Sequence, residues 1–169
     1  AHGQAGDAGA AEAVLDHLGE AALPAGLRLW TLDVRARSAM LQNDGDRALA
    51  SFEALAELAR AQYDDEALWR AHVGRAEALT ALGQPDAALA AYAAAEALLS
   101  RQTLQVPIHA GRESFLARRE WATRRQLALL LSRGHVETAF EVARRARIRI
   151  LETLRREDRL DALSAPEQR

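Results

Sequence analysis

The stretch DDEALWRAHVGRAEALTALGQPDAALAAYAAA, residues 64 to 95, decides the fold. Its two aspartates suit the start of a helix, Gly83 suits the end of that helix, and Pro85 stands where the first turn of a second helix tolerates proline. Alanine, which has the best intrinsic helix propensity, is the commonest residue of the stretch. The stretch therefore predicts a hairpin of two helices, one ending at Leu82 and the other running from Asp86 to about Arg101.

This pattern recurs along the chain. Trp30, with its neighbours, returns as Trp69 at a shift of 39, and Phe52 returns as Tyr92 at a shift of 40. A third pass follows Gly134. Repeats of about 20–50 residues are typical of solenoids, whose units must stack to bury their apolar faces. We expect an all-α solenoid of about seven antiparallel helices, and a scaffold rather than an enzyme.

The expected organisation is one capping element followed by three hairpins. Residues 1–24 are predicted to form an N-terminal extension and capping helix. In residues 25–169 the hairpins are expected at about 27–61, 64–101 and 109–157, before a polar C-terminal tail. Asn43, Asp44 and Gly45 mark the first hairpin turn, and Asp46 is the expected N-cap of the helix after it.

Composition narrows the class of protein. All 22 basic residues are arginine, which indicates codon bias in a GC-rich bacterial genome, and 49% of the chain is apolar, enough for a continuous core. The absence of cysteine excludes disulfides, thiolate metal sites and a cysteine nucleophile within this sequence. The chain begins with Ala1 and has no apolar run near the ~18 residues of a membrane span, so we expect an excised piece of a cytoplasmic protein.

Residues 83 to 95 carry a family resemblance. Alanine or tyrosine stands five, nine and twelve residues after Gly83, as in the second helix of a tetratricopeptide repeat, and Ala76 matches the small residue of that family's first helix. Arg75 and His72 depart from the pattern, because the family usually has a large apolar residue and a tryptophan there. The resemblance implies a TPR-like α-α superhelix whose concave groove binds a protein or peptide.

The last third of the chain is similar to a more specific segment. GRESFLARR at residues 111–119, three leucines at 129–131, Gly134 and RARIR at 145–149 resemble the segment that links tetratricopeptide arrays to a caspase-like CHAT domain in bacterial multidomain proteins. Arg144 departs from that pattern, which usually has Glu, and Ile148 replaces the usual Ala. The resemblance implies a scaffold or sensor module that couples to a downstream effector domain of the same chain.

The groove of such a superhelix is the candidate binding site. Its first helices would line the concave surface, and arginine and tryptophan are the side chains most enriched at binding hot spots. In the alternative interpretation the tryptophans pack between helices, which we favour for Trp30 and Trp69, whereas Trp121 stays open. Transferring the family's groove positions gives Arg35, Ser38, Arg70, Glu77, Trp121 and Arg124.

The sequence gives little indication of a metal site, a catalytic site or a surface that binds nucleic acid or lipid. The five histidines lack the spacing of a metal site, and no serine stands in a nucleophile motif or phosphate-binding loop, so we expect no metal, no cofactor and no catalytic residue. Residues 1–101 hold 15 acidic and 8 basic groups, and residues 102–169 hold 9 and 14. A solvated, ion-paired arginine face, including Glu141 with Arg145, explains this better than nucleic acid or anionic lipid.

Two further expectations concern the surfaces of the helices. The final helix, from Val136 into the 150s, is predicted to bury an apolar face that includes Ala139 and Phe140, with Arg149 on the opposite, solvated face. It would then couple groove occupancy to the next domain. The competing function is homo-oligomerisation, in which the alanine-rich face of residues 87–97 pairs with a second copy.

Overall fold

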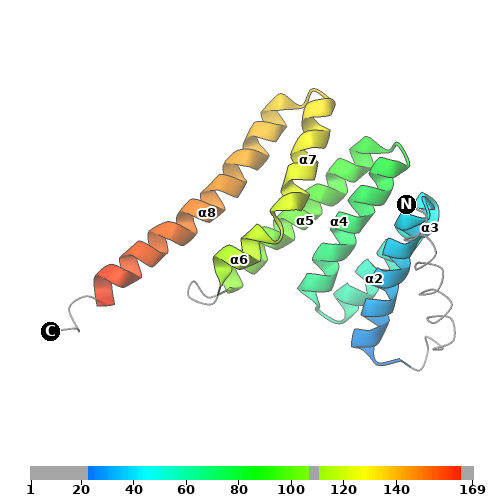
Figure 1. Ribbon diagram of the computed structural model, residues 1–169, viewed down its shortest axis with the longest axis horizontal. Coiled ribbons are helices and arrows are strands. Elements are labelled where there is room, and N and C mark those ends of the chain that lie inside the picture. The colour runs from blue at the N-terminus through cyan, green and yellow to red at the C-terminus, as the bar shows by residue number, and fades with distance from the viewer. Residues whose placement is uncertain (1–22, 107–110, 165–169) are drawn as a thin grey trace. The chain divides into compact units, whose positions relative to one another are not determined.

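The computed structural model describes residues 23–106 and 111–164, and within these residues the chain contains seven helices and no strand (Figure 1). The predicted capping helix of residues 1–24 lies almost wholly outside the described residues. The helices form two compact units, one ending at Ala95 and one beginning at Glu96, so that the boundary falls within a helix. The helices are α2 (Ala25–Leu41), α3 (Gly45–Ala61), α4 (Asp65–Ala81), α5 (Pro85–Gln105), α6 (Arg112–Ala117), α7 (Glu120–Ser132) and α8 (Val136–Ser164).

The first unit has a helical repeat with a period of 40. Helices α2 and α4 both contain 17 residues, and the start of α4 at Asp65 corresponds to the start of α2 at Ala25. In the same register α5 begins at Pro85 and α3 at Gly45. The turns agree, because Asn43 at φ 58° and Gly83 at φ 70° both adopt the left-handed conformation. Of the residues expected at the first hairpin turn, Asn43 and not Gly45 is therefore the counterpart of Gly83.

Aspartates begin two of the helices. The carboxylate of Asp64 accepts a hydrogen bond from the backbone N–H of Ala67 at 2.8 Å, which confirms the predicted cap of α4. The predicted cap of α3 at Asp46 is wrong, because the helix begins at Gly45. Asp44 is the N-cap there and accepts from the N–H of Arg47 at 3.1 Å.

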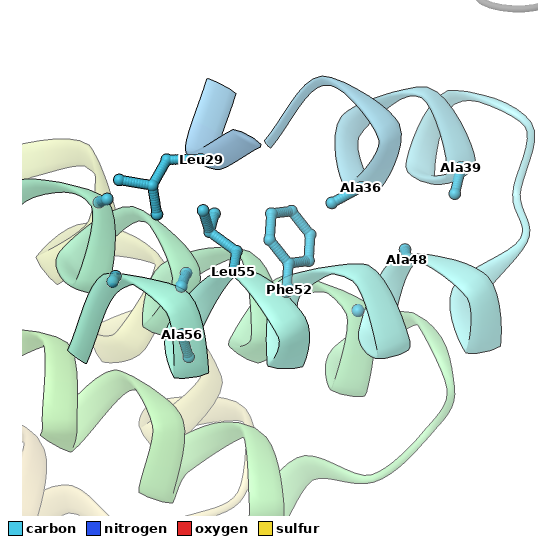
Figure 2. Close-up of a cluster of buried hydrophobic side chains, with 11 residues drawn as sticks. Leu29, Ala36, Ala39, Ala48, Phe52, Leu55 and Ala56 are labelled. Atoms are coloured by element: carbon cyan, nitrogen blue, oxygen red, sulfur yellow. The ribbon is translucent and has the colours of Figure 1, made fainter. Parts of the chain in front are cut away.

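The core of the first unit lies between α2, α3 and α4. Figure 2 shows Phe52 and Leu55 of α3 pointing toward Leu29 and Ala36 of α2. On its other side Phe52 lies against α4 at Gly74, where a Cβ atom would overlap the aromatic ring. Small residues thus let three helices approach one large side chain.

The second unit differs from the prediction at two places. Helix α5 continues to Gln105, beyond the expected end at Arg101. The third hairpin, expected at about 109–157, begins with two helices, α6 and α7, in place of one, and Arg119 turns inward between them. Its side chain is buried, lies 3.8 Å from the centre of the Phe115 ring, and donates a hydrogen bond to the Phe115 carbonyl at 3.1 Å. That bond satisfies a carbonyl at the end of α6.

The predicted buried face of α8 is confirmed at Ala139 and wrong at Val136 and Phe140. Ala139 and Val142 are buried, whereas Val136 and Phe140 are 62% and 66% exposed. Helices α6 and α7 contact α8, and they cover only one edge of the expected apolar face. None of the described helices is both long and apolar enough to cross a membrane.

Candidate functional site

The six predicted groove residues divide between the two units. In the first unit Arg70 and Glu77 are partly exposed on α4, and Arg35 is partly exposed on α2. Ser38 is buried, which removes it from the surface. In the second unit Trp121 is 39% exposed, with the Arg125 guanidinium 5.4 Å from its ring. The structure therefore gathers Arg70 and Glu77 on one helix face but places the tryptophan in a different unit.

Arg124, the sixth predicted residue, lies on the exposed side of α7. Its side chain forms an ion pair with Glu120 at 3.0 Å, one helical turn earlier. Surface pairs of this kind contribute little to stability. The pair nevertheless occupies the guanidinium that was expected to face a ligand.

The period of 40 identifies two surface residues that sequence reasoning missed. Arg70 and Glu77 of α4 correspond to Trp30 and Arg37 of α2, and both of these are exposed. The sequence comparison had matched Trp30 with Trp69 at a shift of 39, and it had favoured a packing role for both. Trp69 is indeed buried, at 6% exposure, but Trp30 is 53% exposed, so the packing role for Trp30 is wrong.

The burial of equivalent positions explains why Trp69 is buried and Trp30 is exposed. Trp69 corresponds to Leu29 at the period of 40, and both are buried. Trp30 corresponds to Arg70 and shares its exposed helix face. The signal that could have revealed this was Asn43, a residue that tolerates the left-handed turn conformation and that a shift of 40 aligns with Gly83.

A buried carboxylate joins α2 to α4 at this surface. Asp33 is 6% exposed. Its Oδ1 accepts a hydrogen bond from Nε of Arg37 at 3.1 Å, and its Oδ2 accepts one from Nη1 of Arg70 at 2.9 Å. The two arginines are thus held beside each other, one from each helix, because a buried carboxylate requires partners. We call Trp30, Arg37, Arg70 and Glu77, together with Asp33, the A-helix surface, because they all lie on α2 or α4, the first helix of each repeat unit.

A histidine in the same unit has a perturbed pKa. Burial, followed by the nearby positive charges of Arg75 and Arg60, lowers the pKa of His72 from 6.5 to about 4. Its Nδ1 atom is buried and has no hydrogen-bond partner among the described residues. The imidazole is therefore neutral at physiological pH, and no carboxylate of the described residues shares a proton with it.

The second unit contains an ion pair that was not foreseen. Arg149 of α8 donates from Nη1 to the Glu96 carboxylate at 2.7 Å and to the Ser100 hydroxyl at 3.0 Å. The hydroxyl of buried Thr123 also donates to Glu96. Both members of the ion pair are mostly buried. Arg149 therefore ties α8 to α5, and its predicted place on a solvated face is wrong.

The surface ion pairs of α8 also differ from the prediction. Glu141 pairs with Arg144 at 2.7 Å rather than with Arg145, whose Nε atom donates to the Glu141 carbonyl instead. The hydrogen bond from Arg144 lowers the pKa of Glu141. The Glu–Arg spacing of three residues prevails here over the expected spacing of four.

In the part of the chain that the structure describes, no cluster of three or more histidine, aspartate or glutamate side chains could hold a metal ion. Comparison with known proteins adds no assignment: no protein-family profile, no curated protein and no solved structure matches the chain. Two surfaces of the described residues remain as candidate binding sites, the A-helix surface and the exposed face of α8.

Proposed function

We propose that this chain is a non-catalytic module that binds a protein or peptide on the A-helix surface. The observation that carries the proposal is the placement of Arg37 and Arg70 on one buried carboxylate, beside the half-exposed Trp30. Tryptophan and arginine dominate the binding energy of protein interfaces because they combine area with directional donors. Asp33 fixes the two guanidinium groups in advance and so lowers the entropy cost of binding.

The chemistry of the surface favours a particular ligand. A guanidinium carries five N–H donors, and the bonds to Asp33 use one on each arginine. Apart from the buried Nε of Arg70, the remaining donors suit carboxylates. The Trp30 ring suits an apolar or aromatic side chain. We therefore expect a peptide that carries an acidic residue close to an aromatic or large aliphatic one.

Selection from a random peptide library displayed on phage, with the purified chain as bait, tests this proposal. We expect enriched peptides whose binding is lost in Trp30→Ala and weakened at least about tenfold in Arg37→Ala. Tyr63→Ala is the matched control, because Tyr63 is an aromatic residue that is 94% exposed in the turn between α3 and α4. Enriched peptides that bind Trp30→Ala as well as the unchanged chain would overturn the proposal.

We infer further that the repeat units are TPR-like and form a superhelix. We also infer that the chain belongs to a larger, cytoplasmic bacterial protein in which α8 adjoins a CHAT-like effector domain. The packing of α2, α3 and α4 in sequence order supports the repeat, and the resemblance of about residues 105–155 supports the neighbour. Sequencing the gene beyond the codon for Arg169 tests the second inference. A reading frame that stops there, or that continues into an unrelated domain, would contradict it.

A further inference from the structure

An apolar face of α8 is open in the described part of the chain. Val136, Phe140, Ile148 and Leu151 are between 38% and 66% exposed. At 3.6 residues per turn they fall within an arc of about 120°. The helices that contact α8 lie on the side of Ala139 and Val142, which are buried. Apolar side chains gathered on one helix face indicate an interaction surface.

The alternative self-pairing surface, the alanine-rich face of residues 87–97, is already partly covered. Ala88, Ala91 and Ala95 are all buried within the chain. They are therefore not accessible to a second molecule, whereas Ala87, Ala90, Ala93 and Ala97 of the same stretch are exposed. Each of these alanines offers only a methyl group, so α8, with the larger exposed side chain of Phe140, is the stronger candidate for contact between copies.

The charges on the open face of α8 point to a specific occupant. Glu137 and Arg147 are both exposed on this face, and neither forms an ion pair with another residue whose side chain is described. Ten residues separate them, which is about 15 Å along the helix axis. A second α8 that runs antiparallel across this face, with its centre at residue 142, would set Glu137 opposite Arg147 twice.

The antiparallel pairing of two α8 helices also brings the apolar residues of the two copies together. A twofold axis at residue 142 sets Val136 opposite Ile148 and brings Phe140 next to Arg144 of the other copy. A guanidinium over an aromatic ring is a favourable contact. A twofold interface requires self-complementarity of this kind, because each residue meets its partner twice.

We propose that the open face of α8 binds a second copy of this chain, in an antiparallel, twofold-symmetric dimer. The surface is small, and it contains three exposed charged residues, Glu137, Arg144 and Arg147, so the dimer forms at high protein concentration rather than as an obligate assembly. The interface does not include Trp30, Arg37 or Arg70. Dimerisation and peptide binding at the A-helix surface can therefore be tested separately.

Sedimentation velocity of the 169-residue chain over a range of concentrations measures the dimer directly. We expect Phe140→Asp to weaken dimerisation about 100-fold, because each dimer buries this side chain twice. The matched control Tyr63→Asp changes an aromatic residue that is even more exposed and should leave the dimer unchanged. An unchanged chain that remains monomeric at every concentration, or a Phe140→Asp variant that dimerises equally well, would overturn the proposal.

Charge exchange tests the antiparallel arrangement. Glu137→Arg sets arginine against Arg147, and Arg147→Glu sets glutamate against Glu137, so each variant alone should dimerise less well than the unchanged chain. An equimolar mixture of the two should form heterodimers, and the double variant should dimerise as the unchanged chain does. Single variants that dimerise normally, or a mixture that stays monomeric, would exclude this pairing of the helices.

Discussion

At the scale of single residues, the period of 40 shows where two polar side chains depart from the repeat. Asp33 occupies the position that Val73 fills in the next unit, and both are buried. A carboxylate in that position requires the two arginines that it binds. His72 corresponds to Leu32, which packs against the core. The Nδ1 atom of His72 is buried without a hydrogen-bond partner. This burial should therefore lower the free energy of unfolding.

The pH dependence of stability should report His72. The native imidazole stays neutral until about pH 4, whereas the same group in the unfolded chain takes up a proton near pH 6.5. Between these values the unfolded state binds more protons, so the free energy of unfolding falls as the pH is lowered. We expect a loss of about 1–2 kcal/mol, less than the full shift implies, because solvent reaches the edge of the ring.

Urea unfolding at about pH 7 and about pH 5 measures this loss. The variant His72→Leu, which introduces the residue found at the equivalent position of α2, removes the titrating group. Its stability should change less between the two pH values than that of the unchanged protein. An equal pH dependence in both proteins would mean that other groups cause the loss.

At the scale of elements, the contact between α3 and α4 depends on the absence of a side chain. Gly74 lies in the interior of α4, where alanine would raise the helix propensity by about 1 kcal/mol. A methyl group there would nevertheless overlap the ring of Phe52, which is fully buried. The destabilisation from steric crowding in a packed core is larger than the stabilisation from the higher helix propensity of alanine.

Gly74→Ala should therefore destabilise the protein by about 1–3 kcal/mol, measured by urea unfolding followed by circular dichroism. Gly26→Ala is the matched control, because Gly26 also lies in a helix but has open space around its Cβ position. That substitution should be neutral or stabilising. Adding Phe52→Leu to Gly74→Ala should recover part of the loss, since the smaller side chain leaves room for the methyl group. A Gly74→Ala variant as stable as the unchanged protein would show that the ring can move aside.

Local signals predicted most helices and turns of the first unit, because caps and turn residues act over a few positions. Asp64, Gly83 and Pro85 predicted the start of α4 and the turn between α4 and α5 almost to the residue. The surface residues were less predictable, because a shift of one position rotates a side chain by about 100° around the helix. The match of Trp30 with Trp69 had that error. The inward turn of Arg119 could not be predicted, since it depends on a buried site formed only in the folded unit.

At the scale of the whole molecule, contacts gather within two units that meet inside α5. Each unit has a large buried side chain of its own, Phe52 in the first and Leu130 in the second. In repeat proteins, contacts with nearest neighbours carry most of the stability. A defect in one unit should therefore leave the other largely folded.

Hydrogen exchange detects this independence. Phe52→Ala creates a cavity that costs about 3–5 kcal/mol. We expect faster exchange of backbone amides in α2, α3 and α4, with little change in α7 and α8. Leu130→Ala should give the reverse pattern. If either substitution accelerates exchange equally in all of these helices, the two units unfold together and the prediction is wrong.

The matching turns at Asn43 and Gly83 make the length of the first unit adjustable. Residues 45–84 comprise α3, the following turn and α4, and the next helix begins at Pro85 just as α3 begins at Gly45. A duplicated copy of these residues would therefore begin and end at equivalent points of the backbone. Gene duplication could therefore lengthen the array by whole 40-residue units, each of which adds binding area without any new fold.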